Sequence, residues 1–394
     1  MTFTVLTRQF AISLLALSLV GTSCSRNGDS AGAKPWIPEE DGAYHVREGE
    51  DIQAAIEAAA KDERHKVVKV HEGTYFPRQA GQAFLWLNRK HDGIRLEAVG
   101  KVTLTAANPK VAIVTGRSFP AIVNHVVYFG HGISDSTVLD GFEITGANGH
   151  MIQEGVESID PGLPESLKPT LFFYSDGGAV KVYGDSCPQL LNLKVHKNEV
   201  RVCGGGISVD QHGLCQTPVL IRNCTFLDNS CPATGSAVDV LQDSKANIEN
   251  CLFVGNIGNY GMDEIGKTFG LSYNAKHGCG ALSVFPKSTA RVSRCTFTSN
   301  WSGVDDKGIA SRYENCIFWK NDRSDGSRTG QPYELDVNKS AHVEGCFIFG
   351  TISDLQKSIA PDLNQFSKLD PEFDSTYVPQ SPHHQEVGYR PVTR

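Results

Sequence analysis

The sequence lacks long hydrophobic runs and is poor in charge. Its one extended apolar stretch, Phe10–Val20, has about half of the roughly twenty residues that a membrane-spanning helix needs. Charged residues are 21% of the chain and the formal net charge is −7, which gives no reason to expect nucleic acid as a partner. The 13 histidines show no zinc-type spacing such as HExxH, and no glycine-rich phosphate loop is present. The sequence therefore offers no motif for a zinc-dependent or nucleotide-dependent enzyme.

What the sequence does contain is enough apolar material for a large folded domain. Hydrophobic residues are 40% of the 394, which rules out general disorder. Glycine is abundant at 39 residues, and the 11 cysteines are too few for a small disulfide scaffold. The length fits one large domain or two medium ones.

The first residues predict export. Phe10–Val20 ends in small residues, as the apolar core of a signal peptide does. Cys24 comes next, which resembles a bacterial lipoprotein, whose first mature cysteine carries lipid. Ordinary cleavage with an incidental cysteine is the alternative, because Gly21 stands where an aliphatic residue is usual. We expect a signal peptide over 1–23, a flexible tether over 24–43, and a protein of the periplasm or cell surface that contacts a membrane only through a lipid anchor.

A short pattern recurs through most of the remaining chain. Each copy has a turn residue, a core residue, an aromatic or aliphatic residue two positions later, and a closing Asn. It reads NLKVHKN at 192–198, NCTFLDN at 223–229, NCLFVGN at 250–256, RCTFTSN at 294–300 and NCIFWKN at 315–321, with partial copies at 141–148 and 345–351. The turn residue is Gly or Asn except at Arg294, and Gly and Asn enter left-handed backbone at least cost. The closing Asn side chains can form a ladder of amides along a stack.

A second pattern alternates with the first. It reads GGAVKVYGD at 177–185, GGGISVDQH at 204–212, GSAVDVLQD at 235–243 and CGALSVFPK at 279–287. Its valines, isoleucine and leucine fall in two columns two residues apart, a period that predicts strands with one buried face. Strands that return every 21–31 residues, with no helical pattern between them, predict coils that stack into parallel sheets.

The predicted fold class is therefore all-β, a single right-handed parallel β-helix over 44–390. An antiparallel sandwich is the alternative, but it does not explain why the same side chains return in the same columns. Residues 51–60 have a helical pattern and predict a helix that caps the first coil, with Asp51 as its N-cap. The tail after Leu369 is expected to cover the other end, since bare sheet edges invite aggregation.

Several of these segments resemble known β-helix proteins. IQAAIEAAAKDERHKVVKVHEGTY at 52–75 and VLDGFEITGANG at 138–149 are similar to the opening coils of pectate-lyase-like proteins. GGAV at 177–180 and the FxxN endings resemble the repeats of polymorphic outer-membrane proteins, and LDPEF at 369–373 resembles a frequent C-terminal ending. The resemblance implies the fold. It does not imply an activity, because these motifs are structural and no catalytic motif of the lyases is intact.

The outward-facing positions of the second pattern are the candidate site. One face of such a sheet forms a long shallow groove that suits an extended polysaccharide, and insertions at 146–176 and 257–279 are expected to wall it. The candidate residues are Lys181, Tyr183, Asp185, Asp210, His212, Asp239, Asp243, Phe285 and Lys287. Because adjacent coils lie about 4.8 Å apart, we expect the carboxylates of Asp210, Asp239 and Asp243 to converge. Such a cluster can bind Ca²⁺ through oxygen or supply an acid–base pair.

Two mechanisms fit this set. In a uronate lyase, Lys181, His212 or Lys287 would be the base and Ca²⁺ at the three aspartates would stabilise the developing charge. In a glycoside hydrolase, Asp239 would act with Asp210 or Asp243. The substrate-binding set is Tyr183, Asp185, Phe285 and Lys287, whose aromatic members can stack on sugar rings.

The predicted function is an exported carbohydrate-active protein that binds an extracellular polysaccharide, with cleavage left open. The alternative is a non-catalytic adhesin or glycan-binding surface protein, which the outer-membrane repeats favour. A third reading is that the outward residues are only a solvated polar face.

The cysteines divide into two groups. Five occupy the core position of the first pattern, where a buried thiol behaves as a small hydrophobe: Cys224, Cys251, Cys295, Cys316 and Cys346. Cys187 with Cys215, and Cys203 with Cys231, are candidate disulfides, because they flank equivalent strands of adjacent coils. Cys279 is left over.

Overall fold

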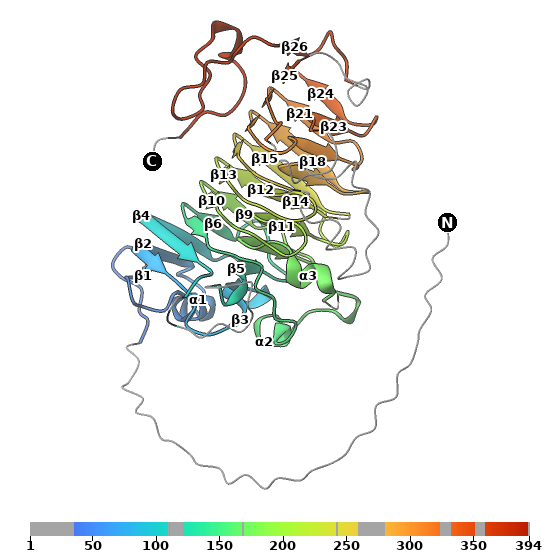
Figure 1. Ribbon diagram of the computed structural model, residues 1–394. Helices are drawn as coiled ribbons and strands as arrows, with labels where there is room; N and C mark the ends of the chain where they lie inside the picture. The colour runs from blue at the N-terminus through green and yellow to red at the C-terminus, as the bar shows by residue number, and fades with distance from the viewer. Residues whose placement is uncertain are drawn as a thin grey trace, which may run out of the picture. The chain divides into compact units, whose positions relative to one another are not determined.

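The repeating segments form successive coils whose short strands stack side by side (Figure 1). The computed structural model describes residues 35–108, 110, 121–167, 169–241, 243–258, 280–323, 332–350 and 359–392. The predicted signal peptide 1–23, Cys24, Cys279 and most of the insertion 257–279 lie outside these residues. The folded unit begins at Trp36, so it takes in residues 36–43, which the sequence assigned to the tether.

The strands belong to two sheets. Among the described residues the smaller sheet has eight strands, from β3 to β23, and is called here the eight-strand sheet. Its members are β3 (Gly81–Leu87), β5 (Val123–Phe129), β8 (Val180–Tyr183), β11 (Ile207–Asp210), β14 (Val238–Val240), β17 (Leu282–Val284), β20 (Val304–Asp306) and β23 (Leu335–Val337).

The larger sheet, as far as the structure describes the chain, has eighteen strands in two rows. The first row holds β1 (Ala43–Val46), β2 (Val67–Tyr75), β4 (Arg95–Thr105), β6 (Val138–Asp140), β9 (Gln189–Leu191), β12 (Val219–Arg222), β15 (Lys245–Glu249), β18 (Thr289–Ser293), β21 (Arg312–Glu314) and β24 (His342–Glu344). The second row holds β7 (Glu143–Thr145), β10 (Lys194–His196), β13 (Thr225–Leu227), β16 (Leu252–Val254), β19 (Thr296–Thr298), β22 (Ile317–Trp319), β25 (Phe347–Phe349) and β26 (Gln365–Ser367). The long strand β4 joins the rows, because it pairs with β6 at its start and β7 at its end.

A coil in the middle of the chain runs through one strand of each row, for example β12, β13 and then β14. Each strand pairs in parallel with its counterpart in the next coil, as β12 does with β15 and β14 with β17. This confirms the predicted fold class, a right-handed parallel β-helix. The hand agrees with the strong preference of parallel connections for right-handed crossovers.

The corners between the first and second rows use left-handed backbone, as predicted. Asn192, Asn223, Asn250 and Asn315 have φ between 52° and 56°. Arg294, the exception in sequence, adopts φ 52° like the others. The geometry of the coil therefore imposes this conformation even on a side chain that prefers it less.

The closing asparagines form the predicted ladder. Each side-chain Nδ2 donates to the Oδ1 of the next, from Asn198 through Asn229, Asn256 and Asn300 to Asn321, over 3.1, 3.0, 2.9 and 2.8 Å. All five are at most 1% exposed, so these bonds satisfy amides that have no access to water. Beside the ladder, the core-position cysteines are buried and free, as expected.

The two ends are finished differently. α1 (Ile52–Lys61) covers the first coil, and the Asp51 side chain accepts a hydrogen bond from the Ala54 amide at 3.1 Å, which confirms the predicted cap. The C-terminal tail was expected to cover the last coil. Instead its final part runs back along the outside of the second row, where Arg390 N donates to Asn250 Oδ1 at 2.8 Å (Figure 1).

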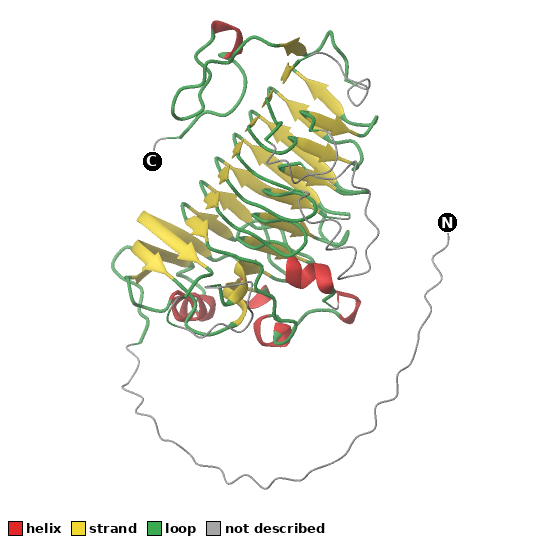
Figure 2. Cartoon of the chain, viewed as in Figure 1, coloured by secondary structure: helices red, strands yellow, loops and turns green. Residues whose placement is uncertain are grey.

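In the described part of the chain helices are few and, apart from the short η4 (Pro382–His384) of the tail, lie beside the first coils (Figure 2). They are α1, α2 (Val156–Ile159), α3 (Leu171–Ser175) and the short turns η1 (Arg89–His91) and η2 (Glu165–Leu167). Among the described residues, no helix has the length and apolar character to cross a bilayer. The segment with α2 and α3 packs against the outer side of the eight-strand sheet, where Val156, Ile159 and Phe173 join Tyr128 and Tyr183 in a second apolar cluster.

Candidate functional site

Lys181 faces outward from the coil on β8, yet its side chain is fully buried. Its Nζ lies 2.7 Å from Asp176 Oδ1, 3.2 Å from Asp210 Oδ2 and 3.3 Å from Ser208 Oγ. Strand pairing explains the arrangement, because Lys181 stands opposite Ser208 in the register of β8 and β11. Buried charges persist only when paired, so these four residues act as one unit, named here the Lys181 centre.

Burial and charge oppose one another in the Lys181 centre. Burial raises the pKa of Asp176 to about 7, despite the nearby ammonium. Burial would also raise the pKa of Asp210, but Lys181 and His212 outweigh it and the pKa is lowered. For Lys181, burial favours loss of the proton, yet the two carboxylates prevail and raise its pKa. Lys181 is therefore an ammonium at neutral pH and Asp210 a carboxylate.

The rings of Phe173 and Tyr183 cover the Lys181 centre and are named here the aromatic roof. Phe173 of α3 is 1% exposed and meets the Tyr183 ring edge-on, with 4.6 Å between the centroids. Lys181 Nζ lies 5.7 Å from the Phe173 centroid and 5.4 Å from that of Tyr183, within the range of cation–π attraction. The Tyr183 hydroxyl donates to the carbonyl of Leu167 at 3.0 Å. The insertion 146–176 thus lies over the sheet, whereas the sequence predicted that it would stand at the side of an open groove.

His125 completes the underside of the roof. Its ring lies 6.0 Å from that of Phe173, and its Nδ1 is 3.0 Å from the carbonyl oxygen of Gly177. Burial, helped by the charge of Lys181, lowers the pKa of His125 to about 3. The imidazole is therefore neutral, and its Nδ1 carries the proton that it donates to Gly177.

His212 connects the Lys181 centre to solvent. Its side chain is 43% exposed, and its Nε2 lies 3.1 Å from Asp210 Oδ1. Its ring packs edge-on against Tyr183 at 5.2 Å, and its backbone is left-handed with φ 53°. A carboxylate thus orients an exposed imidazole, and a buried ammonium holds the carboxylate. This is a geometry in which His212 can accept a proton from a bound molecule.

Four predicted site residues therefore do come together: Lys181, Tyr183, Asp210 and His212. The prediction that they line an open groove was wrong for three of them, because Lys181, Tyr183 and Asp210 are 0%, 2% and 7% exposed. The repeat could not predict this, because the covering segment is not part of the repeat. Asp176 was missed, although it directly precedes the GGAV segment in the sequence.

The other two aspartates do not join Asp210 in one cluster. Asp239 stands opposite Ser208, two positions from Asp210 in register, and is fully buried, with the Thr234 hydroxyl donating to it at 3.1 Å. Burial raises its pKa well above the usual value. Asp243 is exposed at a left-handed turn with φ 61°. The expected convergence of three carboxylates is wrong, because Asp239 is buried within β14, opposite Ser208, whereas Asp243 lies in an exposed turn beyond the end of that strand.

The remaining predicted residues lie apart from the Lys181 centre. Asp185 is half-buried and its amide donates to His131 Nδ1 at 3.2 Å. Phe285 is half-buried, and Lys287 is exposed with φ 70°. In the described part of the chain, no group of three or more His, Cys, Asp or Glu side chains is arranged to hold a metal ion. Asp210, Asp239 and Asp243, which the sequence predicted to hold calcium, do not form one carboxylate cluster.

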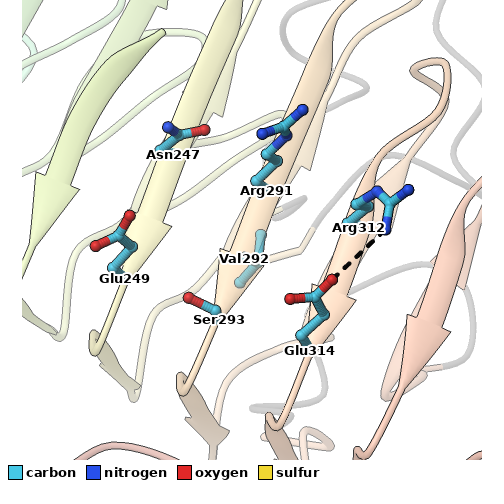
Figure 3. Close-up of a pocket in the computed structure, with 7 residues that line it drawn as sticks. All are labelled: Asn247, Glu249, Arg291, Val292, Ser293, Arg312 and Glu314. Atoms are coloured by element: carbon cyan, nitrogen blue, oxygen red, sulfur yellow. Dashed lines mark ion pairs between the residues drawn. The ribbon is translucent and has the colours of Figure 1, made fainter.

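An open groove lies elsewhere, on the outer face of the first row (Figure 3). It crosses β15, β18 and β21, encloses about 350 Å³, and is lined by Asn247, Glu249, Arg291, Val292, Ser293, Arg312 and Glu314. Arg291 pairs in register with Asn247 on one side and Arg312 on the other. The two guanidinium groups therefore stand one coil apart, about 4.8 Å at the backbone.

Arg291 lacks the acidic neighbour that three other strands of this face provide. In β4 and β21 an arginine, and in β24 a histidine, is followed two residues later by a glutamate, at 3.1 Å (Arg95–Glu97), 3.7 Å (Arg312–Glu314) and 2.9 Å (His342–Glu344). In β18 the second position is Ser293. Arg291 is exposed and makes no ion pair with any residue that the structure describes. Its guanidinium is thus free to meet an anion from solution.

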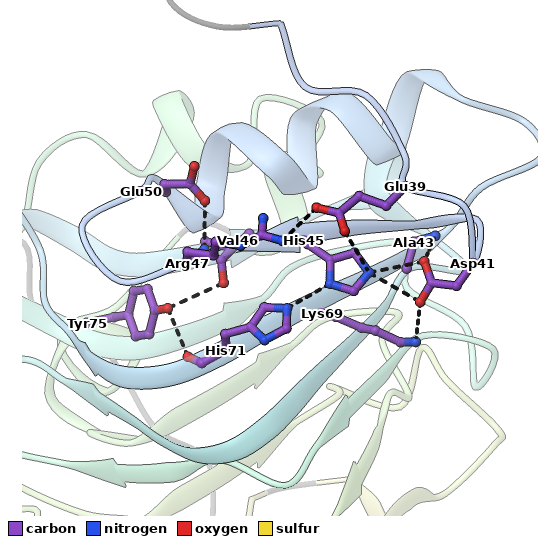
Figure 4. A network of polar contacts seen from close by, with 10 residues as sticks. All are labelled: Glu39, Asp41, Ala43, His45, Val46, Arg47, Glu50, Lys69, His71 and Tyr75. Carbon is purple, nitrogen blue, oxygen red and sulfur yellow. Dashed lines mark hydrogen bonds and ion pairs between the residues drawn. The ribbon is translucent and has the colours of Figure 1, made fainter.

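Another polar network holds the start of the folded unit in place (Figure 4). His45 Nδ1 lies 2.7 Å from His71 Nε2, and His45 Nε2 lies 3.0 Å from Asp41 Oδ1. Lys69 adds an ion pair to Asp41 at 2.6 Å, and these side chains hold the segment before β1 against β2. The partners satisfy one another, so we assign the network a structural role.

Comparison with known proteins does not assign the chain to a family. No protein-family model matches the chain, and no curated protein is similar to it in sequence. Among solved structures, it matches a PL6 family alginate lyase at 11% sequence identity and a TM-score of 0.22, over 88% of this chain. The match covers 56% of that enzyme, so the chain spans little more than half of its length.

Proposed function

We propose that this protein binds an extracellular acidic polysaccharide in the groove across β15, β18 and β21. The observation that supports this most is Arg291, an exposed guanidinium in the middle of the groove with no ion-pair partner among the described residues. A planar guanidinium binds carboxylates and sulfates through two parallel hydrogen bonds. The net charge of −7 disfavours polyanions in general, so a local cation of this kind is what such a ligand needs.

The repeat of the coil suits a repeating ligand. Arg291 and Arg312 are in register in adjacent strands, so their spacing follows the coil rise of about 4.8 Å, close to the length of one sugar ring. Asn247 in the preceding coil offers an amide in the same column. A uronate chain that lies along the stack would therefore place successive carboxylates and hydroxyls over successive coils.

Cleavage is the second candidate function, and a specific feature favours it. Asp210 orients the exposed His212, as a general base requires. Lys181 is a poor candidate for the base, because its carboxylates keep it protonated and the roof keeps it from a polymer. Within this proposal His212 removes the proton, and Lys181 and Asp210 position it.

We also propose that the protein is exported and attached through lipid at Cys24, from the signal-like segment 1–23. The test is membrane fractionation of cells that express the full chain or C24A. The parent chain should sediment with membranes and incorporate a labelled fatty acid. If it were soluble and unlabelled like C24A, the anchor would be excluded.

A glycan panel tests the proposed function. The purified protein is run through native gels that contain polygalacturonate, alginate, hyaluronan or neutral dextran, and the same polymers are assayed for unsaturated uronides and new reducing ends with and without calcium. We expect retardation by at least one acidic polymer and none by dextran. Products that disappear in H212A would support cleavage, and binding without products would support the non-catalytic adhesin. Failure to bind any acidic polymer would contradict the proposal.

A further inference from the structure

The turns that follow β8 and β11 bring two thiols together beside the Lys181 centre. Cys187 and Cys215 are both free and each is 6% exposed. The Cys187 and Cys215 Sγ atoms approach the carbonyl oxygens of Ile133 and Thr217 at 3.6 and 3.5 Å, and each thiol shifts the pKa of the other. We propose that Cys187 and Cys215 are a redox site, which an oxidising disulfide reagent converts into a covalent bridge between adjacent coils.

Gln211 holds the two turns in place independently of the thiols. Its Nε2 donates to the carbonyl of Ser186 at 2.9 Å and to that of Thr217 at 3.2 Å. One amide group thus bridges the residue before Cys187 and the residue two after Cys215. The pair is brought together by the fold and does not depend on a chance approach of flexible loops.

The chemistry of the pair is asymmetric. Interaction with the Cys187 thiol lowers the pKa of the Cys215 thiol, and the same interaction raises the pKa of Cys187. Cys215 is therefore the thiol that ionises first and attacks. Its neighbours Leu214 and Gln216 are exposed, so a small reagent can approach this turn.

The core column of cysteines provides a contrast within the same chain. Cys224 and Cys251, for example, precede strands that pair in parallel register, β13 and β16. Their Cβ atoms therefore stay about 4.8 Å apart and point the same way, whereas a disulfide needs a Cβ separation of about 3.5–4.5 Å. Both are also fully buried. Proximity of thiols along the core column therefore does not predict a bridge, whereas Cys215 lies in a turn whose neighbouring residues Leu214 and Gln216 are exposed.

The step balances with a small disulfide such as oxidised glutathione. The Cys215 thiolate attacks one glutathione sulfur, breaking its S–S bond and releasing one glutathione thiolate. The Cys187 thiolate then attacks Cys215 Sγ and displaces the second glutathione. The two protein thiols lose two protons and two electrons, and one glutathione disulfide is reduced to two thiols. The bridge would fix the turn that carries Gln211, and therefore Asp210 and His212 on either side of it.

Peptide mapping tests the redox site. The native protein is equilibrated with oxidised glutathione, alkylated and digested with trypsin, which places Cys187 alone in peptide 182–194 and Cys215 in 202–222 together with Cys203. We expect these two peptides to be linked in the parent chain and in the matched C203S variant, and not in C215S. Separate alkylated peptides, or a glutathione adduct without the link, would overturn the proposal. Circular dichroism of C215S checks that the variant is folded, and linkage of Cys187 to another cysteine would also refute the assignment.

Discussion

Replacing Lys181 by methionine removes a buried charge while keeping most of the side-chain volume. The change leaves Asp176 and Asp210 under the roof without the ammonium that lies 2.7 and 3.2 Å from them. Loss of one partner from a buried ion pair costs about 3–5 kcal/mol, and we expect K181M to lose that much free energy of unfolding at pH 8. Urea denaturation followed by circular dichroism measures it.

The pH dependence of that loss is the sharper part of the prediction. Lys181 keeps the folded-state pKa of Asp210 below its usual value against the effect of burial, so without Lys181 that pKa rises and the folded variant binds a proton that neither the folded parent nor the unfolded chain binds. Stability is then recovered as pH falls, and the gap between parent and K181M should shrink from pH 8 to pH 5. The double variant K181M/D176N lacks one of the two carboxylates that K181M leaves without a cation, so it should recover part of the lost free energy of unfolding at pH 8.

Lys194 provides a matched control. Its side chain is 49% exposed and its Nζ pairs with Glu143 Oε1 at 2.8 Å, so K194M should cost less than about 1 kcal/mol. If K181M were as stable as the parent, or if its loss did not change with pH, the description of Lys181 as a buried, charge-paired ammonium would be wrong.

Two further predictions concern stability. N256A removes a ladder amide that donates to Phe226 O and Asn300 Oδ1 at 2.9 Å each, and it removes the Oδ1 that accepts from the Nδ2 and the backbone amide of Asn229. We expect it to lower the free energy of unfolding by about 2–4 kcal/mol, against much less for N338A in a surface turn. Equal losses in the two variants would refute the ladder as a stabilising element. The pKa of His125 is about 3 in the folded protein, below its unfolded value of about 6.5. Its contribution to the free energy of unfolding is therefore fully present above pH 6.5 and is lost on acidification by about 1.4 kcal/mol per pH unit. H125F should show a flatter stability profile between pH 6 and 4, and an identical slope in both proteins would contradict the burial of a neutral imidazole.

The periodic part of the fold was predictable because equivalent positions of successive coils lie in the same structural environment. The corner residues, the apolar columns and the asparagine ladder all follow from a repeat that places one side chain type in one environment. Arg294 adopts the same left-handed backbone as the asparagines at equivalent corners, so the geometry of the coil determines the conformation at this position and the residue type does not. The C-terminal tail was harder, because nothing in LDPEF says whether it turns over the last coil or back along the side.

The site was less predictable because it depends on what lies between the repeats. Alternation correctly placed Lys181 and Asp210 on the outer side of the sheet, but the segment that covers them belongs to an insertion with no repeating pattern. The groove was missed for a different reason. Its residues come from the strand before the first pattern, where R-V-S at 291–293 and R-Y-E at 312–314 also alternate, and comparing these two segments could have exposed the unpaired Arg291.

The most direct test of the central claim is the affinity for polygalacturonate of the parent chain, R291A and R95A, measured by isothermal titration calorimetry. Arg95 is the matched control, because it lies on the same face but already pairs with Glu97. A hydrogen-bonded charge contributes roughly 1.5–3 kcal/mol, so R291A should bind at least about tenfold more weakly while R95A binds like the parent. Equal affinity of R291A and the parent, or equal weakening in R95A, would contradict the assignment of this groove as the glycan site.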